Sequence, residues 1–447
     1  MISVPSPRLL LSGSKFFTLF LLFIVFSCSP SKRAVKKDDV QVVKSGEDGK
    51  PKDKNDVPST TKVDTLQWRK DNNLPPITEK KGDEIGMEED LMKESYIVSM
   101  FIPFKARDHD QDDDRFSQYY AGIKLGAAQL ENEGISLTIN AFDSDESKTP
   151  VSLVPEETDI IVGPYEEAGL KAMIEYGKEK QIPVISPWYS LSKVEQNPYY
   201  VQLRPTLKDH FNAMVNHISK NFKASEVVLV GRNNKNDQAW FKFFQVAGQK
   251  YYNTQAPKIF VEHFVLDDSL ALGQWVFGDL LDKGKKVFII PNHSFKDESY
   301  IYSVLRRLNA EKHGQKIVVY GMPIMIDSDR IDFDYYNSLN MRVVVSEFVD
   351  DKDSKVASFG RKFFDEYGTL PENDAFEAYD MILFIGRNLK NHGRKFQFRF
   401  QKDSEEYLQT SFDIMPFKKE DSDTIEFYEN KHLSIIGFSQ GRFKKID

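Results

Sequence analysis

Short apolar runs alternate with longer amphipathic segments over most of the chain. Residues 96–104 (YIVSMFIPF) form a mostly apolar, β-branched run, which is typical of a buried strand. After a polar loop, apolar residues recur at helical spacing between positions 116 and 130, and Gly134 stands where such a helix would stop. A strand followed by a helix of this length is the unit of a parallel α/β sheet.

The same alternation continues and predicts two consecutive series. Strands alternating with helices give parallel sheets covered on both faces, so we expect an α/β fold of two doubly wound parallel-sheet lobes. Ligands of such folds bind beyond the carboxyl ends of the strands. The further strands are predicted at 135–142, 159–163, 183–186, 226–230, 258–264, 287–290 and 316–320, and the helices at 166–180, 207–222, 237–251, 270–281 and 299–310.

The N-terminal residues have the pattern of a secretory signal. Arg8 and Lys15 precede an apolar run, 16–26 (FFTLFLLFIVF), which is too short to span a bilayer. A signal peptide directs the rest of the chain out of the cytoplasm. No later segment is long and apolar enough to be a transmembrane helix.

The end of this signal resembles a bacterial lipobox. In residues 25–28 (VFSC) the cysteine would be lipid-modified and become the mature N-terminus, although Phe26 departs from the commoner residues at its position. The resemblance implies a lipoprotein signal peptide over 1–27, a lipid-modified Cys28 and a membrane anchor. A plain secretory signal or an uncleaved anchor remains the alternative.

A polar segment separates Cys28 from the first strand. Residues 28–94 are rich in Lys, Asp, Glu, Pro, Ser and Thr, so they bury too little apolar surface to offset chain entropy and are expected to form a flexible tether. Within it, residues 63–77 carry Trp68 and two prolines. This piece either docks on the folded body or is an exposed linker.

Charge and composition exclude several function classes. The 447 residues carry a formal net charge of -8, whereas a nucleic-acid partner requires a basic face, so none is expected. The only cysteine is Cys28, which rules out an intramolecular disulfide and a cysteine zinc site. The acidic loop 108–114 lacks the glycine and glutamate spacing of an EF-hand. No nucleophile, P-loop or metalloprotease motif is present, so we expect no enzyme, cofactor or metal.

Six segments follow one another in a recognisable order and spacing: 120–126 (YAGIKLG), 159–164 (DIIVGP), 182–187 (IPVISP), 197–204 (NPYYVQLR), 359–368 (FGRKFFDEYG) and 375–380 (AFEAYD). Together they resemble the type I periplasmic solute-binding proteins, in particular those for leucine, isoleucine and valine. The resemblance implies a three-crossing hinge and a ligand cleft between two lobes: lobe 1 at 95–206 plus 350–391, and lobe 2 at 207–346 plus 396–447. It implies binding of an amino-acid-like solute, with an ABC transporter permease as partner.

In this family a zwitterionic ligand has its carboxylate held at a helix start on lobe 1. The resemblance places Ser186, Trp188 and Ser190 at the matching strand exit, where a hydroxyl and an aromatic face are available. It also places Tyr165 and Arg204 beside the ligand. Asp209 falls where the family binds the ligand ammonium, but it equally suits a capping box at the start of the next helix.

Two positions depart from the family pattern. Glu166 and Glu167 stand where small hydroxyl residues would face the ligand carboxylate, and residues 321–323 (GMP) stand where an acidic residue would face the ammonium. The solute is therefore cationic or aromatic, or the cleft no longer binds a small molecule.

Lobe 2 offers two polar turns at strand exits. Asn234 and Asp237 stand in one turn and Asn292 in the other, where they would line the cleft. Ordinary turn chemistry and helix capping is the alternative interpretation, and the favoured one.

Two functions of different classes follow. The first is a solute-binding lipoprotein that closes its lobes around a small polar molecule, amino-acid-like or cationic. The second is a tethered interaction or regulatory lipoprotein, acting on an envelope protein in cell-wall synthesis or sensing. In both cases we expect a cell-envelope location, anchored in the outer membrane and facing the periplasm.

Overall fold

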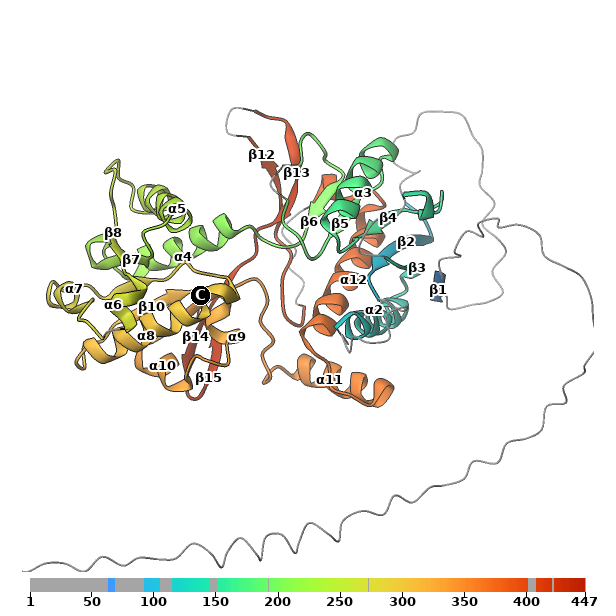
Figure 1. Cartoon of the computed structure of the whole chain (residues 1–447). Coiled ribbons are helices and arrows are strands. Elements are labelled where there is room, and N and C mark those ends of the chain that lie inside the picture. Colours follow the sequence, from blue (N-terminus) through green and yellow to red (C-terminus); the bar gives the residue numbers. More distant parts are fainter. Residues whose placement is uncertain are drawn as a thin grey trace, which may run out of the picture. The chain divides into compact units, whose positions relative to one another are not determined.

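The computed structural model describes residues 63–68 as backbone, and residues 92–104, 115–144, 151–191, 193–271, 273–400, 407–419 and 422–446 more fully. Residues 60–447 form one compact unit. Cys28, the signal peptide and nearly all of the predicted tether lie outside the described residues. Figure 1 shows the helices and strands of this unit.

The described strands form two sheets, each parallel at its centre and antiparallel at an edge. This confirms the predicted fold class of two α/β lobes. The sheet of lobe 1 has the order β1-β3-β2-β4-β5-β6-β13-β12 and that of lobe 2 the order β15-β14-β11-β10-β9-β7-β8. The bounds in lobe 1 are β1 Val63–Trp68, β2 Ser95–Ile102, β3 Ser136–Asp143, β4 Ile160–Val162, β5 Val184–Ser186, β6 Tyr200–Gln202, β12 Ile414–Lys418 and β13 Ile425–Asn430; in lobe 2 they are β7 Val227–Gly231, β8 Val261–Phe264, β9 Val287–Ile289, β10 Val318–Gly321, β11 Arg342–Val345, β14 Ser434–Ser439 and β15 Arg442–Lys445.

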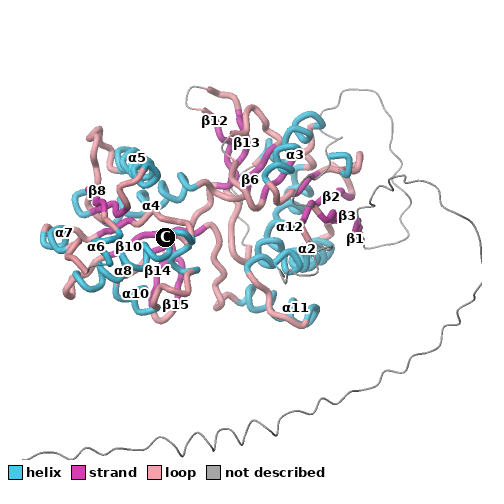
Figure 2. Tube along the Cα trace, viewed as in Figure 1, coloured by secondary structure: helices cyan, strands magenta, loops and turns pink. Residues whose placement is uncertain are grey.

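Helices pack on both faces of the sheet of lobe 1, as a parallel sheet requires. Along β2, Val98 and Met100 face a core shared with α2 and α12, while Phe101 faces a second core shared with α3. In lobe 2 one large core joins the central strands to α4, α5 and α8. Figure 2 separates these helices from the strands by colour. The helices are α2 Arg115–Asn132, α3 Glu167–Lys180, α4 Leu207–Asn221, α5 Lys235–Tyr251, α6 Asp267–Ala271, α7 Gly278–Asp282, α8 Glu298–Glu311, α9 Ile324–Asp327, α10 Phe333–Ser338, α11 Ser354–Tyr367 and α12 Asn373–His392.

The chain passes between the two sheets three times, after β6, after β11 and after β13. Charged residues on these crossings pair with one another. Arg204 on the first crossing binds Glu347 on the second at 2.7 Å. Lys431 on the third binds Asp209, at the start of α4, at 2.8 Å. The three-crossing hinge implied by the resemblance is therefore a set of segments held together by ion pairs.

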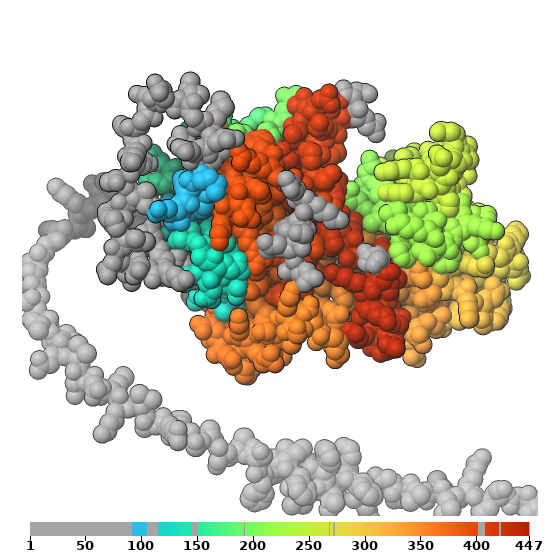
Figure 3. Space-filling model, turned by 180° about the vertical axis from the view of Figure 1, so that it is seen from behind, coloured from blue at the N-terminus to red at the C-terminus, as the bar shows by residue number. Residues whose placement is uncertain are grey.

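The C-terminal residues differ from the expected division into lobes. Residues 396–447 were expected to belong to lobe 2, but β12 and β13 complete the sheet of lobe 1, where β13 pairs with β6. Only β14 and β15 add to lobe 2. In Figure 3 the red C-terminal residues accordingly belong to both lobes. The reason is that a strand pairs with whichever sheet edge it reaches, which its own pattern does not specify.

The helix predicted over 270–281 is interrupted. Two short helices, α6 and α7, replace it, with Gly273 between them at φ +69°. The buried carboxylate of Glu311 on α8 accepts the backbone N–H groups of Val276, Phe277 and Gly278, and so holds the first turn of α7. A distant acidic side chain thus stabilises a helix start that the local pattern does not reveal.

Residues 63–68, inside the predicted tether, form the edge strand β1. The backbone of β1 pairs antiparallel with β3 along six residues, from Val63 opposite Phe142 to Trp68 opposite Leu137. Of the two interpretations of this piece, docking on the folded body is the one that the structure supports.

Candidate functional site

Aromatic side chains gather beyond the carboxyl ends of β4 and β5 in lobe 1. Tyr165 follows β4 and Trp188 follows β5, and their ring centroids lie 5.5 Å apart. Phe116 and Tyr119 reach the same place from α2, at 5.3 Å from Tyr165 and 5.0 Å from Trp188 respectively. Tyr189 joins through Tyr165 at 5.6 Å. These five residues are called the aromatic cluster below.

The turn after β4 brings this cluster close to the sheet. Gly163 has φ +80°, and a Cβ there would lie 2.7 Å from the carbonyl oxygen of Phe101 and 3.1 Å from the ring of Trp188. Only glycine fits such a close approach at positive φ. The indole N–H of Trp188 is buried and has no acceptor among the described residues. It is a polar group to which a ligand oxygen would bind well.

Charged side chains lie beside the aromatic cluster. Arg204 binds Glu347 at 2.7 Å and Glu377 on α12 at 2.9 Å. Arg115 on α2 binds Asp374 on α12 at 2.6 Å and lies over the rings of Phe116 and Tyr165. Arg115, Arg204, Glu347, Asp374 and Glu377 are called the charge cluster below.

The charge cluster shifts the pKa values of its members. Burial and the neighbouring carboxylates of Glu347 and Asp374 raise the pKa of Glu377 to about 8, although Arg204 acts to lower it. Burial works to lower the pKa of Arg204, but Glu347 and Glu377 outweigh it and hold that pKa above the ordinary value. Tyr119 links the two clusters: burial and the charge of Glu377 raise the pKa of its hydroxyl.

The structure brings together the lobe 1 residues predicted from the resemblance, but the two serines do not offer free hydroxyls. Ser186 donates to the carbonyl of Tyr189 at 3.1 Å, and Ser190 donates to the carbonyl of Arg204 at 2.7 Å. Both hydroxyls therefore hold the loop after β5 in place. Tyr165 and Trp188 lie in the aromatic cluster, whereas Arg204 donates to the carbonyl of Pro187 and pairs with Glu347 and Glu377.

Asp209 makes the capping box that was one of its two interpretations. Its carboxylate accepts the backbone N–H of Thr206 at 3.0 Å, and its own N–H donates to the Thr206 hydroxyl. The same carboxylate binds the ammonium of Lys431 at 2.8 Å. An amine of the protein itself thus occupies the carboxylate that the family resemblance gave to a ligand ammonium.

The lobe 2 candidates lie at the carboxyl ends of β7 and β9. Asn234 caps α5 by accepting the N–H of Asp237 at 2.9 Å, and Asp237 accepts the N–H of Arg232 at 2.6 Å. These contacts are the capping chemistry that the sequence favoured for this turn. Asn292 differs: its side chain is fully buried, and neither its nitrogen nor its oxygen has a partner among the described residues. The hydroxyl of Tyr300 is likewise buried without a partner.

Sequence reasoning missed most of the charge cluster. Glu377 lies in the segment 375–380 that carried part of the family resemblance, but no binding role was predicted for it. Arg115 and Asp374 are 259 positions apart in the chain, so no local pattern signals their contact.

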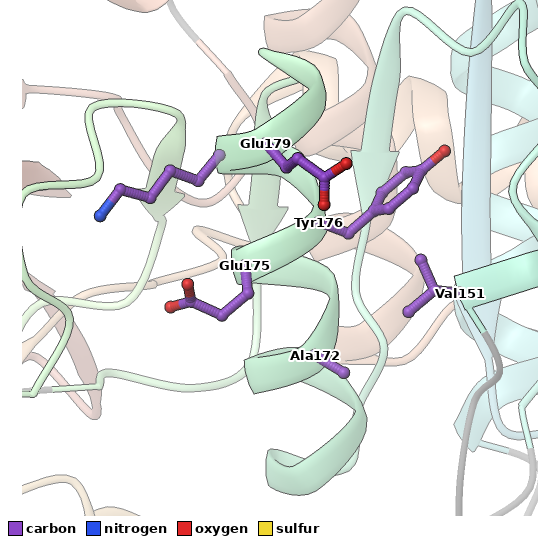
Figure 4. A pocket seen from close by; sticks show the side chains of 6 residues that line it. Val151, Ala172, Glu175, Tyr176 and Glu179 are labelled. Carbon is purple, nitrogen blue, oxygen red and sulfur yellow. The ribbon is translucent and has the colours of Figure 1, made fainter.

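Other features of the described residues do not form a competing site. A hollow of about 490 Å³ on the outer surface of α3 is lined by side chains on two sides of the helix, with Tyr176 and Val151 on one side and Glu175 on the other (Figure 4). Among the described residues no three His, Cys, Asp or Glu side chains are grouped to hold a metal ion. No helix in the described part of the chain is long and apolar enough to cross a membrane.

Comparison with known proteins bears on the fold. Residues 123–252 match the model of the receptor family ligand binding region. A putative branched-chain amino acid ABC transporter protein from Rhodospirillum rubrum superposes with a TM-score of 0.57 at 13% identity, over 79% of this chain and 100% of that one. An ABC transporter substrate-binding protein from Desulfitobacterium hafniense gives 0.51 at 11% identity, and its complex with Leu gives 0.50 at 12%, both with the same coverage. No curated protein sequence matches the chain.

Proposed function

We propose that this chain, which has the fold of the type I periplasmic binding proteins, binds a small polar solute that carries a positive charge. The fold places solute sites beyond the carboxyl ends of parallel strands, where the aromatic and charge clusters of lobe 1 lie. Lobe 2 contributes Asn292 at the end of β9.

The charge balance of lobe 1 carries this proposal. The charge cluster holds three carboxyl groups, those of Glu347, Asp374 and Glu377, against two guanidinium groups, those of Arg115 and Arg204. Because the pKa of Glu377 is about 8, this group keeps a proton at neutral pH, and the excess of one negative charge appears only when a cationic solute beside the faces of Trp188 and four further rings displaces that proton. A cation that contacts both a carboxylate and an aromatic face gains from each, and the gain is larger where water is partly excluded.

A simple amino acid fits the same cluster less well. Its carboxylate would meet Glu166, the N-cap residue of α3, and the acidic groups of the charge cluster, so the repulsion would offset the gain from its ammonium. The indole N–H of Trp188 still provides one donor for a neutral oxygen of the solute. A polyamine, or an amino acid derivative without a free carboxylate, therefore satisfies the site better than leucine does.

The direct test is a thermal-shift screen of the purified chain with spermidine, putrescine, choline, lysine and leucine as probes. A probe present at one hundred times its Kd stabilises the folded state by about 2.7 kcal/mol, which is a readily measured rise in Tm. We expect at least one of the cationic probes to raise the Tm and leucine to leave it unchanged.

A pair of variants tells site binding from general charge effects. Glu377→Gln removes one ionisable carboxyl group of the charge cluster, whereas Glu366→Gln removes an exposed carboxylate on α11. The shift produced by the cation should shrink in the first variant and persist in the second. A flat screen with all five probes would contradict the proposal.

The alternative is that the chain is an interaction protein with a type I fold. One observation favours it: Arg115, Arg204 and Lys431 already pair with the carboxylates that a ligand cation would need. A flat screen is the result that this alternative expects.

Cellular placement is part of the proposal. We propose that Cys28 carries a lipid anchor, that the chain is held at the outer membrane facing the periplasm, and that it delivers its solute to an ABC transporter. The lipobox-like residues 25–28 support the anchor, and the fold likeness to transporter substrate-binding proteins supports the delivery.

A further inference from the structure

The outer face of α5 in lobe 2 carries exposed apolar side chains. Phe241 and Phe244 of this helix are buried in the core of the lobe, and Phe244 packs on Phe211 of α4 with ring centroids 4.5 Å apart. On the opposite side of the helix Phe243 is 43% exposed and Val246 is 61% exposed. In Figure 1 α5 accordingly lies at the periphery of lobe 2, beside α4.

These exposed side chains belong to one stripe along the helix. Ala239, Phe243, Val246 and Lys250 are all exposed and follow one another at intervals of four, three and four residues. Residues spaced in this way lie one above another on a helix surface. A helix at the surface of a globular protein ordinarily has a polar outer face. The second apolar stripe of α5 is therefore not explained by packing within the lobe.

Lysines lie on the same face of the helix. Lys235 and Lys242 are exposed beside the stripe that Lys250 ends. The only acidic residue of α5 is Asp237, which is buried and accepts the backbone N–H of Arg232 at 2.6 Å. The outer face of α5 is therefore basic, although the whole chain has a formal net charge of -8.

The neighbouring elements leave this positive charge uncompensated. Within the described part of the chain, Lys235, Lys242 and Lys250 form no ion pair. The carboxylates on α4, on β8 and in the turn before β7 already have lysine partners of their own. These pairs are Asp209 with Lys431, Glu262 with Lys258, and Glu226 with Lys286.

Helix α4 adds to the same surface. The ammonium of its Lys208 lies 6.0 Å from the ring centroid of Phe243, and a cation at that distance from an aromatic face is attracted to it. The surface formed by Phe243, Val246, Lys208, Lys235, Lys242 and Lys250 is called the α5 face below.

An anionic membrane surface fits the α5 face better than a protein does. The 17 residues of α5 give an outer face about 25 Å long and about 10 Å wide, far smaller than the roughly 800 Å² per partner of a stable protein interface. A second copy of the chain would bring lysines against lysines. Amphipathic helices that lie on a bilayer combine apolar side chains, which enter the headgroup layer, with lysines that contact lipid phosphates. The predicted signal peptide would also bring the chain to a compartment bounded by membranes.

From this arrangement we infer that the α5 face binds the surface of a membrane that contains anionic lipids. Phe243 and Val246 enter the headgroup layer, and the lysines contact the lipid phosphates. The helix lies along the bilayer rather than across it, because its other face is buried in the core of lobe 2. The inference depends neither on the proposed solute site nor on the proposed lipid anchor, because it uses other residues and its test needs no lipid on Cys28.

A fluorescent probe on the α5 face tests the contact. Val246→Cys in a full chain that also carries Cys28→Ser provides one thiol, which is labelled with a nitrobenzoxadiazole dye. We expect the dye emission to shift to shorter wavelength with vesicles of phosphatidylcholine and phosphatidylglycerol in equal parts, and to stay unchanged with phosphatidylcholine alone. Added salt should weaken the binding because it screens the lysines. The same dye at Glu366→Cys, an exposed position of α11, should show no shift.

Two results of this experiment would overturn the inference. One is an unchanged emission at position 246 with both kinds of vesicle, which would leave an acidic protein as the occupant of the face. The other is an equal shift at position 366, because the chain would then meet the membrane without using a particular face.

Matched variants locate the charge contact. Lys242→Gln removes one lysine of the α5 face, and Lys362→Gln removes an exposed lysine of α11. Lys242→Gln should weaken vesicle binding about five-fold, the contribution of one lysine at an anionic membrane surface, and Lys362→Gln should leave it unchanged. The Tm of each variant, measured in parallel, shows that it is folded. An equal loss in both variants would mean general attraction of the protein to the vesicles and would contradict the role given to α5.

Discussion

The carboxyl group of Glu377 lies 2.9 Å from the guanidinium of Arg204, and the carboxylates of Glu347 and Asp374 act on it as well. Its side chain is only 11% exposed, so burial adds to the repulsion from those two acids. Arg204 and Arg115 oppose this, but the net effect is a pKa of about 8. At neutral pH the carboxyl group of Glu377 is therefore protonated, at the position where a cationic solute would place its positive charge.

This shift predicts a pH dependence of stability. A carboxyl group whose pKa is raised by folding keeps its proton in the folded state after the unfolded chain has lost it, so the folded state loses stability as pH rises between about 4.5 and about 8. Glu377→Gln removes this contribution. We therefore expect the difference in unfolding free energy, variant minus wild type, to rise as the pH increases across that window. Urea unfolding at several pH values measures it. A difference that does not change with pH would show that Glu377 ionises normally.

At the scale of elements, α12 organises lobe 1. It packs against α2 along the sheet, presents Glu377 to the charge cluster and binds Glu133, at the end of α2, through Arg387. Between Glu377 and Arg387, the fully buried Asp380 holds the segment 408–410. That segment in turn bonds to the second crossing, because Thr410 donates to the carbonyl of Ser346 and Phe348 donates to the carbonyl of Gln409. Asp380 thus links the helix to the hinge.

Replacing Asp380 should therefore destabilise the protein. Asp380→Ala would leave the backbone N–H groups of residues 408, 409 and 410 without their acceptor, and each unsatisfied buried donor costs about 1–3 kcal/mol. We expect a loss of about 3 kcal/mol in unfolding free energy, measured by chemical denaturation. Asp365→Ala, on the exposed face of α11, is the control and should change little. Equal stability of the two variants would contradict the structural role given to Asp380.

At the scale of the whole molecule, the two lobes are joined by one set of three chain crossings. Arg204, Glu347, Asp209 and Lys431 tie these crossings to one another by ion pairs. The C-terminal residues contribute strands to both sheets, so neither lobe is complete until the end of the chain has folded. The strand β1 adds a piece of the predicted tether to lobe 1, which shortens the segment left between the body and Cys28.

The proposed anchor is tested on the whole protein. Cys28→Ser should abolish incorporation of radiolabelled fatty acid and release the protein from the membrane fraction, because the cysteine thiol is the acceptor of the lipid in a lipobox. Ser27→Ala keeps the cysteine and a small residue before it, so labelling should persist in that variant. Labelling that survives in Cys28→Ser would rule out the lipid anchor at this position.

Alternating apolar runs and amphipathic segments were enough to identify the two α/β lobes, since period and burial are properties of local sequence. The family resemblance further located Trp188 and Arg204 near one another. Other features depend on residues far apart in the chain. These are the ion pairs of Arg204, the ion pair between Lys431 and Asp209, the sheet to which β12 and β13 belong, and the break between α6 and α7. Such contacts are set by packing and by the competition of charges for burial, for which a single sequence carries no periodic signal.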